Sequence, residues 1–166
     1  MKLLLDQDQS SFRQWLAEHN QPAFREQQIR QWLFQNRVAE FDQMQNLPMK
    51  LRTLMASEFR IWSFRVAASL SAADGTEKLL LEHQDGGRIE CVLLRDQQRR
   101  SICISSQIGC AMGCRFCASG LLGVDRNLTT GEILEQMLHL QRLLPADERL
   151  SHMVVMGMGE PLANLD

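Results

Sequence analysis

Four of the five cysteines of this chain fall within fifteen consecutive positions, in the stretch CISSQIGCAMGCRFCASG. Three of them form the pattern Cys110-x3-Cys114-x2-Cys117, and Cys103 lies seven residues before the first. In a chain without a secretion signal, clustered thiols indicate metal ligands or catalytic groups before they indicate disulfide partners. We therefore expect a metal centre on this loop.

The number of thiols favours one kind of centre. An iron–sulfur cubane usually takes four thiolates, so a set of three leaves one iron open to an exogenous ligand, which is a catalytic arrangement. Structural zinc needs four closed ligands. The fourth would have to be Cys91, Cys103, His139 or His152, none of which stands at the usual finger spacing. The spacing predicts a catalytic cluster, with structural zinc as the alternative.

The other residues of the loop suit such a centre. Phe116 can shield a cluster from solvent and offer a flat face to a ligand. The small residues Gly109, Gly113 and Ala118 let the backbone fold tightly round a metal.

The elements that must position this loop are preceded by a helical domain, residues 1–62. Ser11 followed by Gln14 fits a capping box, and Pro48 can start a third helix. Apolar residues recur at helical spacing in three segments. They predict a small three-helix bundle with the aromatic side chains in its core.

Residues 63–100 predict a small β extension and a polar connector. The runs EKLLLEH and RIECVLL predict a hairpin with a turn at Asp85-Gly86-Gly87, and Asp74-Gly75 predicts an earlier turn. The stretch RDQQRR is the connector.

Residues 101–166 predict one βαβ unit. SICISS is the first strand, with the cysteine loop leaving its carboxyl end, and Thr129-x-x-Glu132 begins the helix by the capping-box rule. HMVVMG is continuously apolar, as expected of a parallel strand covered on both faces. The fold class is therefore an α+β accessory region followed by the start of an α/β domain. One helix cannot cover both faces of such a sheet, so we expect the chain to be the amino-terminal portion of a longer protein.

Composition sets broader limits. A hydrophobic fraction of 45% is ordinary for a globular protein, and a net charge of −2 argues against bulk attraction to nucleic acid. Arginine nevertheless makes up 15 of the 18 basic residues, and its side chain is well shaped for phosphate contact. No signal peptide or membrane-length apolar segment is present in the sequence. We expect a cytoplasmic protein without a membrane partner.

The pattern Cys110-x3-Cys114-x-Phe116-Cys117 resembles the signature of radical S-adenosylmethionine enzymes. Gly157-Met158-Gly159-Glu160-Pro161 is similar to the glycine-rich stretch of that superfamily. The resemblance implies a 4Fe-4S cluster and S-adenosylmethionine as cofactors, with Gly159, Glu160 and Pro161 beside the ammonium group of the latter. It also implies that the βαβ unit opens a (βα)6-type barrel.

The segments that flank the cysteine loop resemble a narrower family within this superfamily. CISSQIGCAMGCRFCASG, RNLTTGEIL and VVMGMGEPLANL together resemble the RNA adenine methyltransferases of the RlmN and Cfr family, as does FREQQIRQWLF followed by FDQMQNLP. This resemblance covers nearly the whole chain. It implies methylation of carbon 2 of an adenine in 23S ribosomal RNA, with transfer RNA as a further substrate and carbon 8 as the alternative position.

Family chemistry implies a role for the fourth thiol. Such enzymes methylate one of their own cysteines, and a radical formed on that methyl group adds to the base. A second cysteine then helps to release the protein–RNA adduct and ends in a disulfide; Cys103 stands at its position. Glu90 matches an acidic residue implicated in removing a proton from the adduct. The methyl-carrying cysteine is expected beyond Asp166, so the chain alone is not expected to methylate RNA.

The resemblance also implies binding partners, and two other functions remain as alternatives. The partners are structured RNA and an electron donor such as flavodoxin, and the protein is expected to be a monomer. Candidate phosphate contacts are Arg25, Arg30, Arg99 and Arg100. One rival function is a radical S-adenosylmethionine enzyme that acts on a protein or a small molecule. The other, a non-enzyme, is a zinc-binding RNA adaptor.

Overall fold

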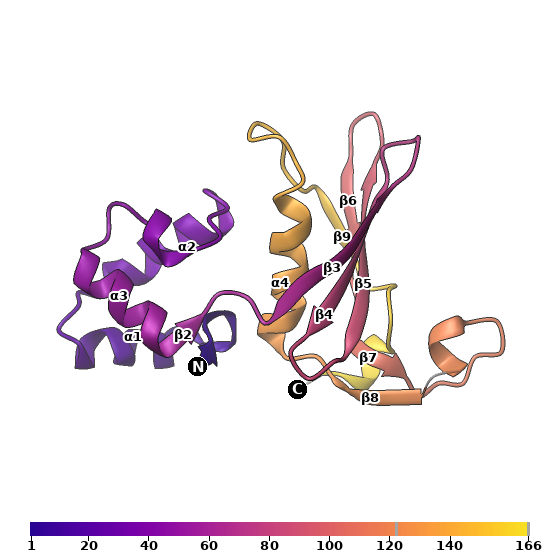
Figure 1. Ribbon diagram of the computed structural model, residues 1–166, viewed down its shortest axis with the longest axis horizontal. Coiled ribbons are helices and arrows are strands. Elements are labelled where there is room, and N and C mark those ends of the chain that lie inside the picture. Colours follow the sequence, from indigo (N-terminus) through magenta and orange to yellow (C-terminus); the bar gives the residue numbers. More distant parts are fainter. Residues whose placement is uncertain (122, 166) are drawn as a thin grey trace. The chain divides into compact units, whose positions relative to one another are not determined.

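The computed structural model describes residues 1–121 and 123–165. It is a mixed α+β structure that divides into two units, Met1–Trp62 and Ser63–Asp166. Figure 1 shows the helices and strands of the two units, each of which has a hydrophobic core of its own.

The first unit combines three helices with one short parallel pair of strands. Its elements are β1 (Lys2–Leu3), η1 (Leu4–Asp6), α1 (Gln9–Glu18), α2 (Phe24–Phe34), η2 (Phe41–Gln43), α3 (Met49–Glu58) and β2 (Phe59–Arg60). Pairing of β1 with β2 brings the start of the unit next to its end. The predicted three helices are confirmed, and Phe12, Phe41 and Phe59 are buried together in one core.

Helix α1 begins earlier than the sequence predicts. Asp8 is its N-cap, and the carboxylate accepts the N–H of Ser11 at 2.8 Å. The predicted capping box of Ser11 with Gln14 is therefore wrong, because an ionised Asp both caps the free N–H groups and suits the positive end of the helix dipole. The helix ends at Glu18, shortly before Asn20, which takes a left-handed backbone conformation with φ 56°.

The second unit is built on a five-stranded sheet of order β3-β4-β5-β6-β9. The strands are β3 (Phe64–Ser71), β4 (Glu77–His83), β5 (Arg88–Arg95), β6 (Arg100–Cys103) and β9 (His152–Val154). Neighbours from β3 to β6 are antiparallel, whereas β9 is parallel to β6 and is reached through α4 (Thr130–Gln141). The predicted hairpin and the βαβ connection are confirmed. The boundary predicted at residue 100 coincides with the first residue of β6, so the β extension and the βαβ unit share one sheet.

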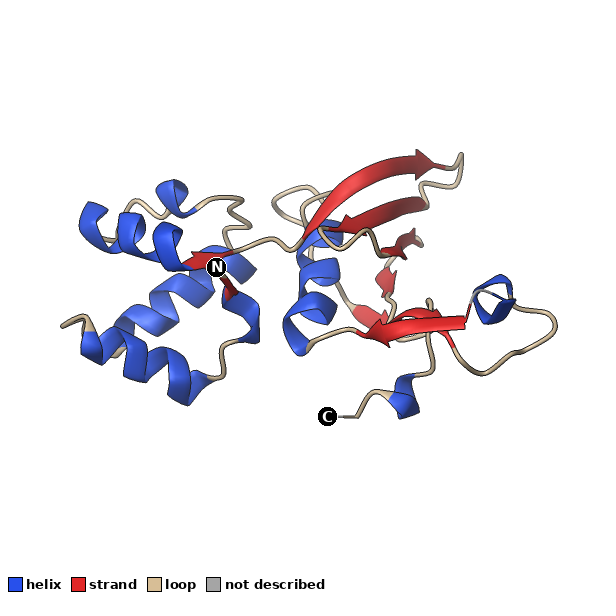
Figure 2. Cartoon of the chain, turned by 60° about the horizontal axis from the view of Figure 1, so that its bottom comes forward, coloured by secondary structure: helices blue, strands red, loops and turns tan. Residues whose placement is uncertain are grey.

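Buried and partly exposed residues alternate along β4 and β5, and the buried ones show which face of the sheet is covered. Leu79 and Leu81 of β4 and Ile89 and Leu93 of β5 are buried and pack with Leu140 of α4. Residues between them, such as Lys78 and Glu90, are partly exposed on the opposite face. Helix α4 therefore covers one face of the sheet and leaves the other open (Figure 2).

Strand β9 differs from the prediction that both its faces are covered. Met153 and Val154 are 51% and 38% exposed, and Met156 just after the strand is 80% exposed. The physical reason is that β9 is the edge of the sheet and is paired only with β6 among the described residues.

A second, unpredicted hairpin carries the cysteine loop. It consists of β7 (Gln107–Cys110) and β8 (Gly123–Asn127), with η3 (Ala118–Leu121) between them. The loop was predicted to leave the end of the strand SICISS, but it leaves β7 instead. Gly109 has φ +77°, and a Cβ there would lie 2.1 Å from the carbonyl oxygen of Gly123, so the two strands approach too closely for any other residue.

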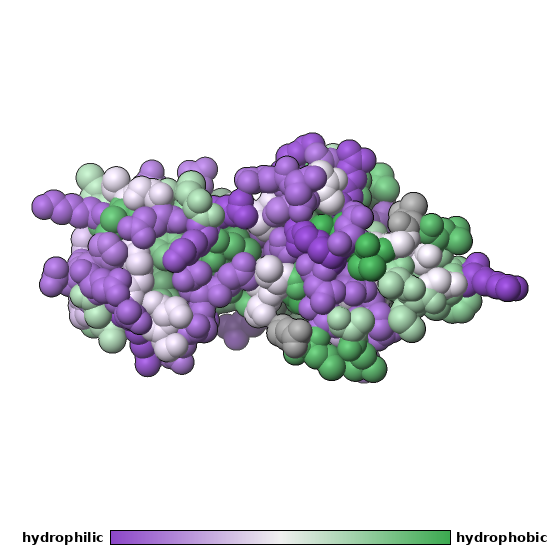
Figure 3. Space-filling model, turned by 90° about the horizontal axis from the view of Figure 1, so that it is seen from below, coloured by the Kyte–Doolittle hydropathy of each residue, from purple (hydrophilic) through white to green (hydrophobic). Residues whose placement is uncertain are grey.

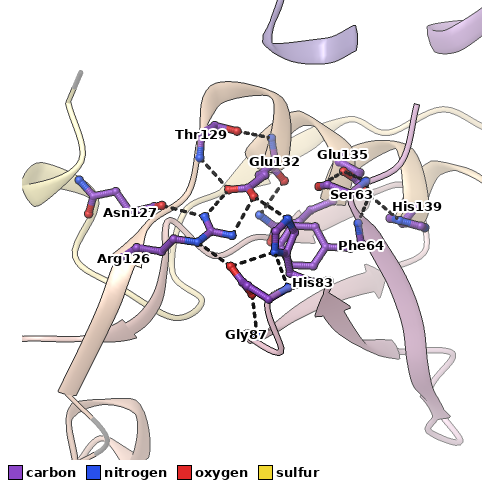
Figure 4. A network of polar contacts seen from close by, with 12 residues as sticks. Ser63, Phe64, His83, Gly87, Arg126, Asn127, Thr129, Glu132, Glu135 and His139 are labelled. Atoms are coloured by element: carbon purple, nitrogen blue, oxygen red, sulfur yellow. Dashed lines mark hydrogen bonds and ion pairs between the residues drawn. The ribbon is translucent and has the colours of Figure 1, made fainter. Parts of the chain in front are cut away.

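The start of α4 is fixed by a polar network that Figure 4 shows in close-up. The predicted capping box is confirmed, because Thr129 and Glu132 exchange side-chain-to-backbone hydrogen bonds. Buried Glu132 also accepts from Arg126 of β8 at 2.7 Å, and Arg126 reaches Asp85 in the β4–β5 turn at 3.0 Å. His83 lies between Asp85 (2.9 Å) and Glu132 (3.4 Å). The network ties the β4–β5 hairpin to the β7–β8 hairpin.

A second buried carboxylate on α4 holds the start of β3. Glu135 has no exposed surface, and its oxygens accept the N–H groups of Ser63 and Phe64 at 2.9 and 2.8 Å and the hydroxyl of Ser63 at 2.6 Å. His139 lies 3.3 Å from the same carboxylate. A buried charge is tolerated here because several donors satisfy it.

Candidate functional site

The three loop cysteines lie in different surroundings. Cys110 is buried at the end of β7, whereas Cys114 and Cys117 are partly exposed beyond it. The N–H of Cys117 donates to the carbonyl of Cys114 at 3.0 Å, so the Cys-x2-Cys pair closes a tight turn. Gly120 completes the turn: its own N–H donates to Cys117, and a Cβ on it would lie 3.0 Å from the backbone nitrogen of Cys114.

Nearby backbone N–H groups also change the pKa of one thiol in this turn, that of Cys117. Hydrogen bonding from the N–H groups of Gly120 and Ser119 lowers the pKa of Cys117 from its ordinary value. Backbone donors stabilise a thiolate, which is the form that binds a metal.

The loop fits an iron–sulfur cluster by the chemistry of its donors. All five cysteines are free thiols. Three of them lie on this one loop, and soft sulfur ligands of this kind select iron–sulfur clusters or zinc. Across residues 1–121 and 123–165, no group of three or more His, Cys, Asp or Glu side chains is arranged around a formed metal site. The donor set is therefore suitable, and closing it requires the loop to bring Cys110, Cys114 and Cys117 together.

Phe116 projects from the loop rather than packing into the fold. It is 94% exposed, and Met112 and Leu121 nearby in the loop are 58% and 77% exposed. Apolar surface of this kind is seen as green patches on the second unit in Figure 3. An aromatic ring so placed contributes nothing to the core, which is consistent with its predicted role as a cover for a bound group.

Cys103 and Glu90 share the open face of the sheet. Cys103 is paired with Val92 of β5, and Glu90 lies two residues from Val92 on the same strand. Opposed residues of antiparallel strands point to the same face, which makes Cys103 and Glu90 diagonal neighbours at a separation of about 7 Å. The Glu90 carboxylate is 2.9 Å from the ammonium of Lys78, on the next strand.

Cys91 lies on the opposite face of the same strands and belongs to the core. Burial, together with the nearby Cys103 and Glu90, raises the pKa of the Cys91 thiol to about 12. A thiol held protonated in this way is a poor metal ligand. Its place in the hydrophobic core, at 1% exposure, also argues against Cys91 as the fourth ligand of a zinc site.

The glycine stretch follows β9 and lies directly against the segment that joins β6 to β7. The carbonyl of Met158 accepts the N–H groups of Ser106 (2.8 Å) and Gln107 (3.3 Å), so this carbonyl is already engaged. Gly159 has φ +100°, and a Cβ there would lie 2.7 Å from the backbone nitrogen of Gln107. The Glu160 carboxylate caps η4 (Pro161–Ala163) by accepting the N–H of Leu162 at 3.0 Å.

Three side chains that the sequence did not single out for this role hold the stretch in place. Gln107 accepts the N–H of Glu160 at 2.9 Å and donates to Asn127 of β8 at 2.7 Å. Asn164 donates to the carbonyls of Ser106 and Leu128 at 2.8 and 3.0 Å. The glycine stretch and the hairpin that carries the cysteine loop are therefore one hydrogen-bonded assembly. The signal that could have found Gln107 is the polar run SSQ inside an otherwise β-branched stretch.

Several known proteins are similar to this chain in sequence. Residues 3–61 match the family described as the ribosomal RNA large subunit methyltransferase N-terminal domain. A probable dual-specificity RNA methyltransferase RlmN of Rhodopirellula baltica is 60% identical over 162 residues, or 98% of this chain. A protein of the same description from Staphylococcus carnosus is 46% identical over 153 residues, or 92% of this chain. The predicted resemblance to the RlmN family is confirmed.

A solved structure is also similar to this chain. The crystal structure of a radical SAM methyltransferase from Sphaerobacter thermophilus matches 99% of this chain with a TM-score of 0.93 and 35% sequence identity. The chain spans 44% of the Rhodopirellula baltica protein, 42% of the Staphylococcus carnosus protein and 49% of the Sphaerobacter thermophilus chain. It is therefore similar to the N-terminal part of these proteins.

No helix in the described part of the chain is both long and apolar enough to cross a membrane.

Proposed function

We propose that the full-length protein containing this chain is a radical S-adenosylmethionine RNA methyltransferase that methylates carbon 2 of an adenine in 23S ribosomal RNA, and in transfer RNA as a second substrate. The observation that carries the proposal is the placement of Cys103 and Glu90 on the open face of the sheet, with β9 and the glycine stretch beside them. The names of the RlmN-type relatives support the same substrate class.

The residues divide into two groups by what they would bind. Cys110, Cys114 and Cys117 would hold a 4Fe-4S cluster, which would supply the electron for reductive cleavage of S-adenosylmethionine. Gly159 and Glu160 would contact the ammonium group of S-adenosylmethionine, with Pro161 fixing the turn that follows. Phe116, which is almost fully exposed, would then cover the bound group.

Cys103 and Glu90 would act on the RNA adduct. Glu90 is a partly exposed carboxylate beside Lys78 on the open face of the sheet, and we propose it as the group that accepts a proton from the adduct. Cys103 is a free, partly exposed thiol that can form a disulfide with a methyl-carrying cysteine supplied from outside residues 1–166. In that step the thiolate of Cys103 would attack the sulfur of the methyl-carrying cysteine. The S–S bond would form as the bond between that sulfur and the methylene carbon on the base breaks, and the electron pair of the broken bond would take up a proton to complete the methyl group of the released base.

The test is a methylation assay with the full-length protein and a 23S ribosomal RNA fragment, read by mass spectrometry of the nucleosides. The intact protein should produce 2-methyladenosine. Cys103→Ala should stop turnover and leave a protein–RNA adduct visible on a denaturing gel, whereas Cys91→Ala, which alters only the core face, should keep turnover. Methylation at carbon 8, or full turnover by Cys103→Ala, would contradict the proposal.

The candidate arginine contacts to RNA differ in whether an acidic side chain already pairs with them. Arg100 is paired with Glu148 alone, so its charge is compensated, whereas Arg30 shares the single carboxylate of Glu26 with Arg13 and is compensated only in part. Arg25 donates instead to the uncharged oxygens of Gln28 and Asn46 and lies over the Phe24 ring at 5.0 Å. Its positive charge remains available for a phosphate.

RNA affinity measured against salt concentration tests this assignment. Arg25→Gln should weaken binding and reduce the slope of log K against log salt by about one. Arg100→Gln is the control, because Glu148 compensates the charge of Arg100, and it should leave the slope unchanged. Equal slopes for the intact protein and Arg25→Gln would remove Arg25 from the interface. The flavodoxin-type electron donor, the monomeric state and the cytoplasmic location remain predictions.

A further inference from the structure

One buried serine, Ser105, connects the strand that carries Glu90 to the glycine stretch. Ser105 follows β6 and has no exposed surface. Its hydroxyl donates to the carbonyl of Glu90 at 2.7 Å and accepts the N–H of Met158 at 2.9 Å. One side chain therefore links the strand of the candidate base to the glycine stretch.

The serine is itself held by a side chain of α4. The amide of Gln136 accepts the N–H of Ser105 at 2.8 Å and donates to its carbonyl at 2.9 Å. Gln136 is also fully buried. Every polar group of Ser105 is thus engaged, as a buried peptide unit outside a regular strand ladder requires.

The glycine stretch packs closely against Ser105, with little room between them. A Cβ on Gly157 would lie 2.7 Å from both the carbonyl oxygen of Ile104 and the hydroxyl of Ser105. On its other side the stretch is open, since Met156 is 80% exposed. Residues 104–107 therefore pack against one side of the glycine stretch, and its other side is exposed.

We propose that Ser105, held by Gln136, is a positioning residue that fixes the glycine stretch relative to the strand of Glu90 and thereby sets the affinity for S-adenosylmethionine. The proposal rests on the proposed function. Without the hydroxyl, the N–H of Met158 and the carbonyl of Glu90 both lose a partly buried hydrogen bond, and the stretch can move away from its binding position.

The experiment uses the full-length protein with its cluster reconstituted anaerobically. S-adenosylmethionine is titrated against the reduced cluster, the change in the electron paramagnetic resonance spectrum gives the dissociation constant, and KM and kcat are measured separately. Ser105→Ala should raise both the dissociation constant and KM about tenfold, with iron content unchanged. An unchanged dissociation constant would overturn the proposal.

Two serines nearby provide matched controls. The Ser106 hydroxyl is buried and makes no hydrogen bond within the described residues, so Ser106→Ala removes no bridge. The Ser151 hydroxyl joins β6 to the residue before β9 at the opposite end of the strand pair, accepting from the N–H of Arg100 at 3.0 Å and donating to its carbonyl at 3.2 Å. Both control variants should bind S-adenosylmethionine as the intact protein does. Equal weakening by Ser151→Ala would mean that any loss of a strand bridge has this effect, and would overturn the proposal.

A second variant covers the case in which Ser105→Ala does not fold. Gln136→Glu keeps the shape of the side chain and its acceptor for the Ser105 N–H, but once ionised it loses the donor to the Ser105 carbonyl. Binding should weaken at high pH and recover as the pH falls and the carboxyl group regains its proton. Affinity equal to that of the intact protein at every pH would refute the positioning role.

The outcomes separate this proposal from the proposed function. If the intact protein shows no spectral change with S-adenosylmethionine, the proposed function fails. If the intact protein responds and Ser105→Ala responds equally, only the positioning role fails.

Discussion

Cys91 and Cys103 lie on adjacent strands but on opposite faces of the sheet, and their surroundings differ accordingly. Cys91 is 1% exposed, and burial raises its pKa to about 12. Cys103, Cys114 and Cys117 are partly exposed. In the metal-free protein, iodoacetamide should therefore modify these three thiols and leave Cys91 unmodified, because alkylation requires an accessible thiolate.

Peptide mass spectrometry after timed alkylation checks this ordering. Alkylation in denaturant, where all five cysteines should react, is the control. Modification of Cys91 in the folded protein at the rate of Cys117 would contradict the assigned register of β5.

Residue roles could be predicted from sequence where they depend on local spacing. The Cys-x3-Cys-x2-Cys pattern falls within eight residues, so the sequence alone identifies it. Ser105 could not be identified in this way, because its partners Glu90, Gln136 and Met158 lie 15, 31 and 53 residues away. Such contacts exist only once the sheet and α4 are assembled.

At the scale of elements, α4 connects the segments around it through buried polar side chains. Glu135 satisfies the first N–H groups of β3 with no exposed surface. Glu135→Ala would leave those donors unpaired, and unfolding free energy should fall by about 2–4 kcal/mol. Urea denaturation monitored by circular dichroism measures the change.

Asp147→Ala is the control for this prediction, because Asp147 is exposed in the same unit. Its effect should stay within about 0.5 kcal/mol. A similarly small effect of Glu135→Ala would show that the carboxylate does not anchor β3.

The β4–β5 turn makes a pH-dependent contribution. Burial alone would raise the pKa of Asp85, but the N–H of Gly87 and the side chains of His83 and Arg126 lower it to about 2 from its usual 3.8. Because the folded-state pKa is lower, the stabilisation is complete above pH 3.8 and is lost as the pH falls towards 2. Asp85→Asn should reduce the loss of melting temperature over this range, measured against the intact protein in matched buffers. An identical acid profile for both proteins would exclude the Asp85 network as its cause.

Most elements could be predicted because their signals are local. The Thr129 capping box and the Asp85-Gly86-Gly87 turn each fall within four residues, and the structure confirms both. The β7–β8 hairpin was missed because its strands are short and separated by the cysteine loop, and because their pairing depends on the close approach at Gly109. The exposure of β9 was missed because an apolar run indicates a buried strand without showing its position at the edge of the sheet.

At the scale of the whole molecule, the first unit has a core that is complete within itself. Leu16, Met44 and Met55 are fully buried among residues of that unit. Residues 1–62 expressed alone should therefore show helical circular dichroism and a cooperative thermal transition, although a domain of this size is only marginally stable.

Met55→Ala in the same fragment supplies the control. It should lower the stability by about 2–5 kcal/mol, and so abolish or sharply lower the transition, because it leaves a cavity in the core. A fragment that is unfolded in both forms would show that the first unit depends on the rest of the protein.

The central claim is that Cys110, Cys114 and Cys117 hold a cluster with one iron left open. The most direct measurement is the electron paramagnetic resonance spectrum of the full-length protein, reconstituted anaerobically with iron and sulfide and reduced, with and without S-adenosylmethionine. The account predicts about four irons per chain and a spectrum that changes when S-adenosylmethionine is added, with both lost when the three cysteines are replaced by serine. A tightly bound zinc with four protein ligands would contradict this claim. A cluster spectrum that does not change when S-adenosylmethionine is added would also contradict it.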